Sequence, residues 1–403
     1  VGTNAAGTAA LPNNLHGIWI DNAPSTQVLD NLISGNDVHG VYVYDTGATG
    51  TQILRNTIGT NAAVTAALPN GYDGIRLEGN SSGTIVGLPS NGNVVSGNSQ
   101  HGVNINSSNG NTIQANFIGT DSSGTIDLGN GLSGVYSDLF NSSNNLIGGD
   151  GAGEGNTIAF NGEGITLESG TNNAILRNAI FANDSLGIDL SDDGVTANDL
   201  LRGDADSGPS ERLNFPEIAS ATESGGVVTV AGTCDVPAGW YRFEFFDNAA
   251  ADPSGYGEGA TWVGSTPLAH TGSGDEPWGA AFPGSAGDII TATLTDCTDA
   301  GCTDFDSTSE FSAAVTVVAA NTPPTFDQDL IDRVDAEATL ISLSSAATDP
   351  DVGDTLTYSA TGLPLGLSID SGTGLISGLV NYYAAASSPY SAEITVCDDG
   401  VPI

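Results

Sequence analysis

Lysine is absent from this 403-residue sequence, and its seven basic residues are all arginine. Against them stand 48 aspartate and glutamate residues, which give a formal net charge of −41 at pH 7. Such a charge repels phosphate groups, so it excludes nucleic acids and anionic membranes as partners. Cations are the natural partners of this surface, and a salty or calcium-rich medium would suit it.

Methionine is also absent, and no apolar run is long enough to span a membrane or to form a signal peptide. The chain opens at Val1-Gly2-Thr3-Asn4, part-way through a repeat. We therefore expect a fragment or a mature segment of a longer precursor, with no membrane insertion in this segment.

Cysteine is scarce, and all four cysteines lie in the second half of the chain. Cys297 and Cys302 bracket a Thr-Asp-Ala-Gly turn. In an oxidising compartment these two residues could close a small loop, so a disulfide between them is predicted. The pairing of Cys234 and Cys397 stays open.

Glycine is abundant, at 55 residues, and it separates the apolar bursts of a repeated module. The module is clearest from His39 to Asn61, where Gly40-Val41-Tyr42-Val43, Gln52-Ile53-Leu54 and Asn56-Thr57-Ile58 are divided by turn residues. Strands this short cannot make an ordinary hairpin meander. A recurring module of this kind predicts one turn, here called a rung, of a parallel β-helix.

The first burst of the module recurs seven times, beginning at Gly17, Gly40, Gly74, Gly102, Gly134, Gly164 and Gly187. Because rungs stack about 4.8 Å apart, equivalent residues should form columns. The third burst predicts an inward column of Ile33, Ile58, Val95, Ile118, Ile158 and Ile180. The middle burst predicts another column of Val28, Ile53, Ile85, Ile113, Ile147 and Ile175.

Polar turn residues follow the third burst at a fixed distance. They are Asn36, Asn61, Asn98, Asp121, Asn161 and Asn183. Asparagine tolerates left-handed backbone and can stack amide on amide, so these residues should hydrogen bond along a column. Alternate rungs also carry nearly identical inserts, at residues 2–13, 59–70 and 119–130, which should stand in a row on one edge.

These motifs resemble the right-handed parallel β-helix repeat family of large bacterial and archaeal secreted chains, over about residues 1–215. The pattern appears at Ile118-Gly119-Thr120-Asp121 and from Asn93 to Asn98. The resemblance implies a right-handed parallel β-helix over residues 1–212, including an acidic exit linker. It does not imply one activity, because the fold hosts lyases, hydrolases, adhesins and structural surface proteins.

From about residue 213 the bursts become longer alternating strands, which predict an antiparallel β-sandwich over residues 213–319. The candidate strands are Val227–Val230, Tyr241–Phe245, Thr261–Val263, Ile289–Thr293 and Ala314–Val317. This stretch resembles the Ig-like module that often follows such β-helices. We expect it to space or dock the open end of the β-helix, because an open end is an aggregating edge.

Residues 320–403 resemble the cadherin-like, Ig-type family of bacterial surface proteins, through the Asn-x-Pro linker at Asn321 and the sequence from Ala347 to Asp354. A second β-sandwich is therefore expected, and the chain is all-β. In that family an Asn-x-Pro linker and a D-x-D element can hold Ca²⁺. The matching positions are Asn321, Asp349, Asp351 and, as an extra ligand, Asp354. The family continues with another strand, so we expect this domain to be incomplete.

A further acidic stretch from Ser191 to Glu211 has no apolar period. Asp204, Asp206 and Gly208 have the alternating oxygen ligands and the glycine turn of a calcium loop, and Asp199 could add charge. The alternative is a solvated acidic linker.

Two columns on the outside of the predicted rungs could carry chemistry. His16, His39 and His101, with Asp73, precede the strand glycines and could hold a transition metal. The alternative is a polar turn position. Trp19, Tyr42, Arg76 and Tyr136 lie among the outward residues and could bind carbohydrate. The alternative is an ordinary solvent-facing or covered surface.

Enzymatic activity is uncertain on this evidence. A lyase acting on acidic sugars needs cations near the substrate carboxylate, and these are scarce here. No pair of carboxylates stands out for hydrolysis, and no Ser-His-Asp spacing or nucleotide-binding loop is present.

The leading hypothesis is an extracellular, structural or adhesive prokaryotic cell-surface protein, a rigid β-helical rod with Ig-like modules stiffened by Ca²⁺. The alternative is a carbohydrate-binding protein, and a polysaccharide lyase or hydrolase is a third candidate. Partners would be other surface proteins, glycans or further copies of the chain. Strand addition beside Ile394-Thr395-Val396 or Ile18-Trp19-Ile20 would give a homopolymeric filament.

Overall fold

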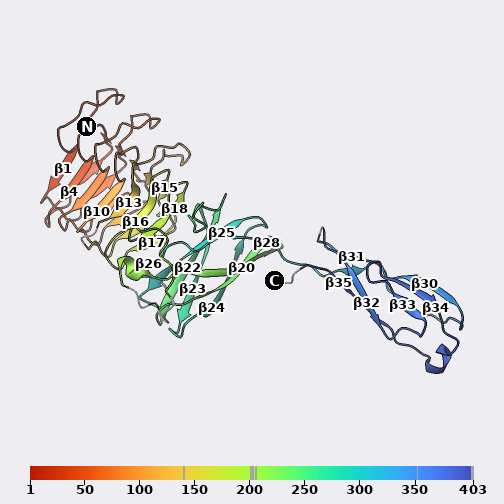
Figure 1. Cartoon of the computed structure of the whole chain (residues 1–403). Helices are drawn as coiled ribbons and strands as arrows, with labels where there is room; N and C mark the ends of the chain where they lie inside the picture. Colours follow the sequence, from red (N-terminus) through yellow and green to blue (C-terminus); the bar gives the residue numbers. More distant parts are fainter. Residues whose placement is uncertain (139–140, 200–203, 205–206, 352, 401–403) are drawn as a thin grey trace. The chain divides into compact units, whose positions relative to one another are not determined.

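The computed structural model describes residues 1–138, 141–199, 204, 207–351 and 353–400. The chain forms two compact units, residues 1–318 and residues 319–403 (Figure 1). The predicted β-helix and the first predicted sandwich together make up the first unit. The second predicted sandwich makes up the second unit.

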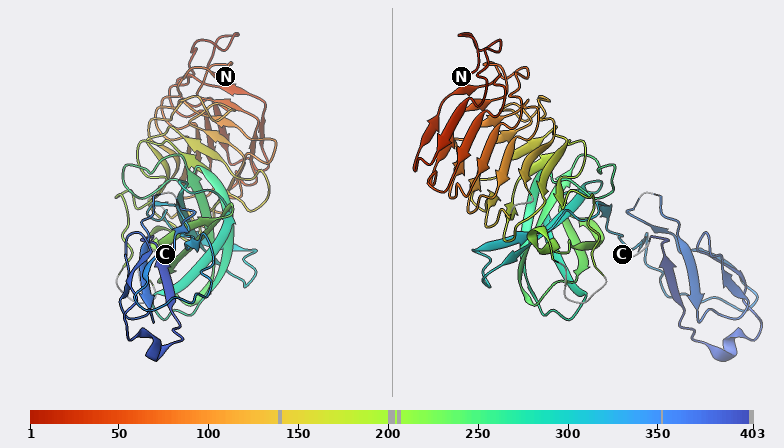
Figure 2. Two further views of the ribbon diagram at one scale, coloured as in Figure 1. Left: turned by 90° about the vertical axis from the view of Figure 1, so that its right-hand side faces the viewer. Right: turned by 60° about the vertical axis from the view of Figure 1, so that its left-hand side comes forward.

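The first unit begins with a parallel β-helix, whose strands stack rung upon rung (Figure 2). Its first sheet contains β1 (Ile18–Asp21), β4 (Val41–Tyr44), β7 (Ile75–Glu78), β10 (Val103–Asn106), β13 (Ser133–Ser137), β16 (Glu163–Leu167) and β19 (Ile188–Leu190). The second sheet contains β2 (Gln27–Leu29), β5 (Gln52–Leu54), β8 (Ile85–Val86), β11 (Thr112–Ile113), β14 (Leu146–Gly148) and β17 (Ala174–Leu176). The third contains β3 (Leu32–Ile33), β6 (Thr57–Ile58), β9 (Val94–Val95), β12 (Phe117–Ile118), β15 (Thr157–Ala159) and β18 (Ala179–Phe181).

The aliphatic columns form the core of the β-helix. The predicted column of the third burst, from Ile33 to Ile180, is confirmed, because all six side chains are at most 1% exposed. In the middle burst the prediction of Ile85 is wrong. Val86 pairs in register with Ile53 and Ile113 and is fully buried. Side chains alternate along a strand, so a one-residue slip turns Ile85 outward. Gly87 marks the correct register, because it follows the inward residue with positive φ, as Gly148 does after Ile147.

Buried asparagine ladders run along the β-helix beside these columns. In each ladder the side-chain Nδ2 donates to Oδ1 of the asparagine on the next rung, at 2.8–3.1 Å. One ladder contains Asn13, Asn36, Asn70, Asn98, Asn130, Asn161 and Asn183. A second contains Asn31, Asn56, Asn93, Asn116, Asn156 and Asn178. A third contains Asn111, Asn145 and Asn173.

The assignment of Asn61 and Asp121 to the first ladder is wrong. Their places are taken by Asn70 and Asn130, the last residues of the inserts. The inserts loop out between those positions, and Asn61 and Asp121 instead accept hydrogen bonds from backbone N–H groups inside their own loops. The insert loops do stand side by side, since the backbone N–H of Ala62 donates to the carbonyl of Gly7.

An antiparallel β-sandwich follows the β-helix within the first unit. One of its sheets contains β20 (Glu217–Ser224), β21 (Val227–Cys234), β24 (Glu276–Pro283) and β28 (Val318–Ala319). The other contains β22 (Gly239–Asn248), β23 (Thr261–His270), β25 (Ile289–Cys297), β26 (Phe305–Thr308) and β27 (Val315–Thr316). A short 3-10 helix, η1 (Pro209–Arg212), precedes it. The predicted strands therefore exist, and most are longer than the sequence pattern indicates.

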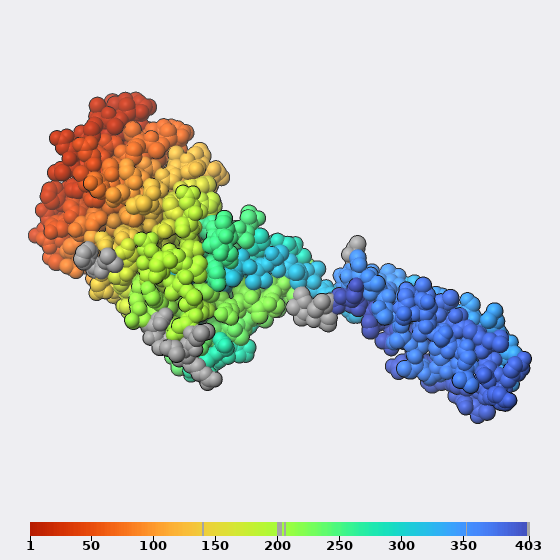
Figure 3. All heavy atoms as spheres, in the orientation of Figure 1, coloured from red at the N-terminus to blue at the C-terminus, as the bar shows by residue number. Residues whose placement is uncertain are grey.

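The sandwich covers the last rung of the β-helix, and the two are in continuous contact in the space-filling view (Figure 3). Phe246 and Phe311 of the sandwich belong to the same apolar core cluster as the inward columns. Gly259 exchanges two backbone hydrogen bonds with Ile180, at 2.8 and 2.9 Å, and so forms an antiparallel bridge on the last strand of the third sheet. The open end of the β-helix is thus paired and buried.

Three glutamates of the sandwich supply acceptors for N–H groups that have no following rung. Glu244 accepts from the backbone of Arg177, Glu258 from Ala182 and Asn183, and Glu310 from Leu190 and Thr196, at 2.6–2.9 Å. Glu258 also accepts from the side chain of Asn183 and so completes the first asparagine ladder. Carboxylates accept hydrogen bonds strongly, so they suit positions where several N–H groups would otherwise lose their partners on burial.

A buried ionic network ties the same interface together. Arg242 donates to Glu244, which is 0% exposed, at 2.8 Å. Arg177 and Arg242 both lie 2.6 Å from Asp150, and the Arg177 guanidinium stacks over Trp262 at 4.2 Å. Two arginines thus balance the charge of the buried Glu244, and both also pair with the exposed Asp150.

The second unit contains short antiparallel strands around a small core of Ile341, Val380 and Ala384. Its sheets pair β29 (Thr325–Phe326) with β31 (Ala347–Thr348), β30 (Leu340–Ser344) with β34 (Leu375–Leu379) and β33 (Leu367–Ile369), and β32 (Thr357–Thr361) with β35 (Glu393–Cys397). A 3-10 helix, η2 (Ala384–Ser387), lies between β34 and β35.

The ladder assignment predicts unequal effects for two asparagines of one insert. Asn70→Ala should lower the free energy of unfolding of the first unit by about 2–4 kcal/mol, because it leaves buried amide groups of Asn36 and Asn98 unpaired. Asn61→Ala removes only loop hydrogen bonds and should cost about 1 kcal/mol or less. Urea unfolding of both variants, followed by circular dichroism, measures the difference. Equal effects would contradict the ladder.

The capping glutamates predict a pH dependence of stability. Burial raises the pKa of Glu310 from 4.5 to about 7, so folding takes up a proton in this range. Its contribution to stability is therefore fully present below pH 4.5 and is lost as the pH rises through 7. The stability of wild type relative to Glu310→Gln should fall by about 1–3 kcal/mol over that interval. Urea unfolding at several pH values provides the measurement. A constant difference would contradict the assignment.

Candidate functional site

The outer face of the first sheet brings the predicted carbohydrate-binding residues into one column. Trp19 pairs with Tyr42, Tyr42 with Arg76, and Arg76 with Asn104, which pairs with Tyr136. The column continues through Thr166 to Asp189. Trp19 is 54% exposed, but Asn104, Thr166 and Asp189 are at most 3% exposed. Neighbouring columns therefore cover much of the face.

The histidine column lies beside it. The His16 and His39 rings stack 5.1 Å apart, and Nδ1 of His39 lies 3.3 Å from the buried Asp73 carboxylate. Arg76 donates to the same Asp73 oxygen at 3.3 Å. Burial raises the pKa of Asp73, but His39, His101 and Arg76 outweigh it and hold the pKa below its ordinary value. Among the described residues these side chains do not form a set of three metal ligands, so the polar-turn interpretation describes this column better.

Arg76 also forms an ion pair with a second neighbouring carboxylate. Its Nε donates to Glu78 at 2.6 Å, and the Tyr42 hydroxyl donates to the same Glu78 oxygen. Arg55, at the position before a third-sheet strand, pairs with Asp30, and Arg177 lies in the interface with the sandwich. Each of these cations is balanced by a carboxylate of the chain.

The aromatic residues of the face fall into two groups. His16, Trp19, Tyr42 and Tyr44 contact one another at the first two rungs, with ring centroids 4.5–6.1 Å apart. Tyr136 lies farther along, stacked on His101 at 4.1 Å, and its hydroxyl donates to Glu168. Trp19 is the most exposed aromatic ring among the four predicted carbohydrate-binding residues.

A carboxylate cluster that the sequence reasoning missed lies at the far end of this face. Glu163, Asp189 and Asp192 each place one oxygen within 4.8 Å of the others. Burial, with Glu163 and Asp192 as nearby charges, raises the pKa of Asp189 to about 6. Glu163 comes from the histidine column, Asp189 from the aromatic column and Asp192 from the acidic exit segment. The signal was available, because Asp189 ends its column just before the acidic segment begins.

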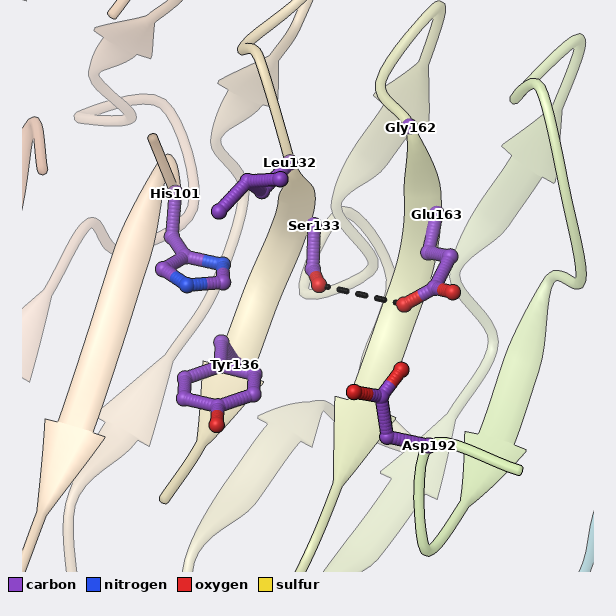
Figure 4. A pocket seen from close by; sticks show the side chains of 7 residues that line it. All are labelled: His101, Leu132, Ser133, Tyr136, Gly162, Glu163 and Asp192. Atoms are coloured by element: carbon purple, nitrogen blue, oxygen red, sulfur yellow. Dashed lines mark hydrogen bonds between the residues drawn. The ribbon is translucent and has the colours of Figure 1, made fainter. Parts of the chain in front are cut away.

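A cavity of about 290 Å³ opens beside this cluster. His101, Ser133, Tyr136, Glu163 and Asp192 are among its lining residues (Figure 4). The Ser133 hydroxyl donates to Glu163, and Thr166 donates to the same oxygen. Burial lowers the pKa of His101, so its imidazole is neutral at pH 7.

The second unit gathers the acidic residues predicted from the cadherin-like resemblance. Asp349, Asp351 and Asp354 place one oxygen each within 4.8 Å of one another. The backbone N–H of Thr322, next to Asn321, donates to Asp351 at 2.6 Å.

Two further aspartates of the second unit, which the sequence reasoning missed, join this group. Asn321 donates to Asp398 at 3.2 Å, and Asp399 accepts from Thr355. Loss of hydration, and then the charges of Asp349, Asp399, Asp351 and Asp398, raise the pKa of Asp354. The run Asp398-Asp399-Gly400 after the last strand was the available signal.

In the exit segment, Asp199 and Asp204 both contact Asn214. The side chain of Asn214 accepts from the backbone N–H of Asp199, and its own backbone N–H donates to Asp204. Within the described part of the chain, both carboxylate oxygens of Asp199 are buried without a hydrogen-bond partner. Asp206, the third predicted ligand, lies outside the described residues.

The cysteines are arranged simply. Cys297 and Cys302 form a disulfide across the Thr-Asp-Ala-Gly turn. Cys234 is a buried free thiol, and Cys397 is an exposed one.

Comparison with known proteins gives one family. The family model described as "Putative Ig domain" matches residues 310–400, which span the end of the first unit and nearly all of the second. A search of curated proteins finds no match. Within the described residues, helices long and apolar enough for a membrane span are absent. The C-terminal stretch is thus similar to an Ig-like domain, which is compatible with an extracellular protein, and the β-helix is identified by its three parallel sheets.

Proposed function

We propose that the chain is an extracellular structural or adhesive protein of a prokaryotic cell surface. The observation that carries this proposal is the joined core of the first unit. Phe246 and Phe311 of the sandwich pack into the apolar cluster of the β-helix, and Glu244, Glu258 and Glu310 cap its last rung. A β-helix capped in this way at its last rung resists unravelling from that end, as a structural or display element must.

Calcium binding would stiffen the segments on either side of the sandwich. In the second unit, Asp349, Asp351 and Asp354 with Asn321 offer the oxygen ligands that Ca²⁺ prefers. One oxygen of Asp349 is buried without a hydrogen-bond partner among the described residues, which favours a bound cation. In the exit segment, the buried carboxylate of Asp199, with Asp204 nearby, makes a second candidate.

The partners of such a protein would be other surface proteins or further copies of the chain. The charge of −41 requires these contacts to be bridged by cations or made through uncharged edges. A homopolymeric filament stays a prediction.

Calcium should raise the thermal stability of the second unit. Without the ion, Asp349, Asp351 and Asp354 repel one another, so a chelator should lower its melting temperature by several degrees. The combined Asp349→Asn and Asp351→Asn variant should lose this response, while Asp335→Asn, which lies outside the cluster, should keep it. Differential scanning calorimetry with calcium and with EDTA is the measurement. Melting that calcium leaves unchanged in the wild type would refute calcium stiffening.

Carbohydrate binding is a second candidate, favoured by the aromatic group at the first rungs. Trp19 is 54% exposed beside Tyr42 and Tyr44, and such rings can stack on sugar faces. Trp19→Ala should abolish binding on a glycan array, whereas Trp240→Ala should leave it intact, because Trp240 is similarly exposed, at 41%, but lies on the sandwich. Absence of binding by the wild type, or equal loss in both variants, would refute this site.

A further inference from the structure

The carboxylate cluster on the outer face of the first sheet has the dimensions of a cation site. One oxygen from each of Glu163, Asp189 and Asp192 lies within 4.8 Å of the other two. Ca²⁺ binds oxygens at about 2.3–2.6 Å, so ligand oxygens on opposite sides of the ion lie about 4.6–5.2 Å apart. Three carboxylates at this spacing can therefore contact one ion with little movement.

Negative charge dominates this cluster, because it contains three carboxylates. In the described part of the chain no arginine forms an ion pair with Glu163, Asp189 or Asp192, although Arg212 pairs with the adjacent Asp193 at 3.6 Å. Asp189 is only 2% exposed, and its hydrogen bonds come from the backbone N–H groups of Asp193 and Gly194. Asp73 and Glu244 of this unit are buried with arginine partners, whereas this cluster has none among the described residues.

His101 supplies an independent observation. Its side chain lines the cavity together with Glu163 and Asp192, and the residue is 8% exposed. Its Nδ1 is buried, with no hydrogen-bond partner among the residues described. Figure 4 shows the imidazole turned into the cavity, on the opposite side of Ser133 from Glu163. This ring nitrogen therefore has an unused hydrogen-bonding capacity at the wall of the cavity.

We propose that Glu163, Asp189 and Asp192 bind a divalent cation of the calcium class, and that His101 hydrogen bonds to water or ligand oxygen on the open side of the ion. An all-carboxylate set favours a hard cation over zinc or copper. The cavity leaves room for the remaining oxygen ligands. The ion would also clamp the exit segment, through Asp192, onto the last two rungs of the first sheet.

This site is distinct from the calcium sites of the proposed function, so its test uses the full chain with those sites removed. The starting variant, called the background protein, carries Asp199→Asn, Asp349→Asn and Asp351→Asn, which remove those sites. Isothermal titration with Ca²⁺ should still detect one ion per chain. Adding Asp192→Asn should weaken that binding by about tenfold or more, because a charged ligand is lost. Asp192 is exposed and outside the strands, so folding should be retained.

Two further measurements locate the ion. Terbium should show luminescence sensitised by Tyr136 in the background protein, and Asp192→Asn should abolish it. Glu168→Gln is the matched control, because Glu168 bonds to Tyr136 but is not part of the cluster, and this variant should keep the signal. The ¹⁵N resonances of the His101 ring should shift on addition of calcium only when Asp192 is present. A background protein that binds no ion, or one whose affinity is the same with and without Asp192, would overturn the proposal.

Discussion

The structure depends on the in-register stacking of asparagine side chains inside the β-helix. Within a ladder each amide donates to the asparagine of the next rung and accepts from the previous one, as Asn93 donates to Asn116 and accepts from Asn56. Corners of the coil expose backbone groups that a strand ladder cannot pair, and an unpaired buried amide is expensive. The ladders satisfy these groups rung after rung, which permits three-sided rungs made from strands of only two to five residues.

A ladder of this kind must end somewhere, and its end explains the position of the sandwich. Asn183 is the last asparagine of its ladder, so no further asparagine follows to accept from its side-chain amide. Glu258 of the sandwich accepts that hydrogen bond instead. Glu244 and Glu310 do the same for the backbones of Arg177 and Leu190. The two folds are therefore joined by hydrogen-bond completion as well as by apolar contact, and the first unit is one body for that reason.

The same acidic composition has three different physical outcomes. Asp73 and Glu244 are buried with arginine partners, and their charge is balanced locally. Glu258 and Glu310 accept hydrogen bonds from N–H groups, and burial raises the pKa of both carboxyl groups. Glu163, Asp189 and Asp192, like the aspartates around Asp354, are crowded together, and no arginine among the described residues pairs with them. With only seven arginines available, external cations are the natural counter-charge for the last group.

By itself the sequence determined the all-β class, the seven rungs and the inward column from Ile33 to Ile180, because local period-two patterns and turn residues encode them. It also indicated Asp349, Asp351 and Asp354, which are close along the chain. Only the tertiary structure decided between Asn61 and Asn70 in the ladder, since the path of an insert sets which end returns to the core. Likewise, only the tertiary structure places Glu163 beside Asp189 and Asp192, and Glu258 beside Asn183. Both sets of contacts depend on the register of the rungs and on docking of the sandwich. Register and docking are in turn set by contacts between residues far apart in sequence.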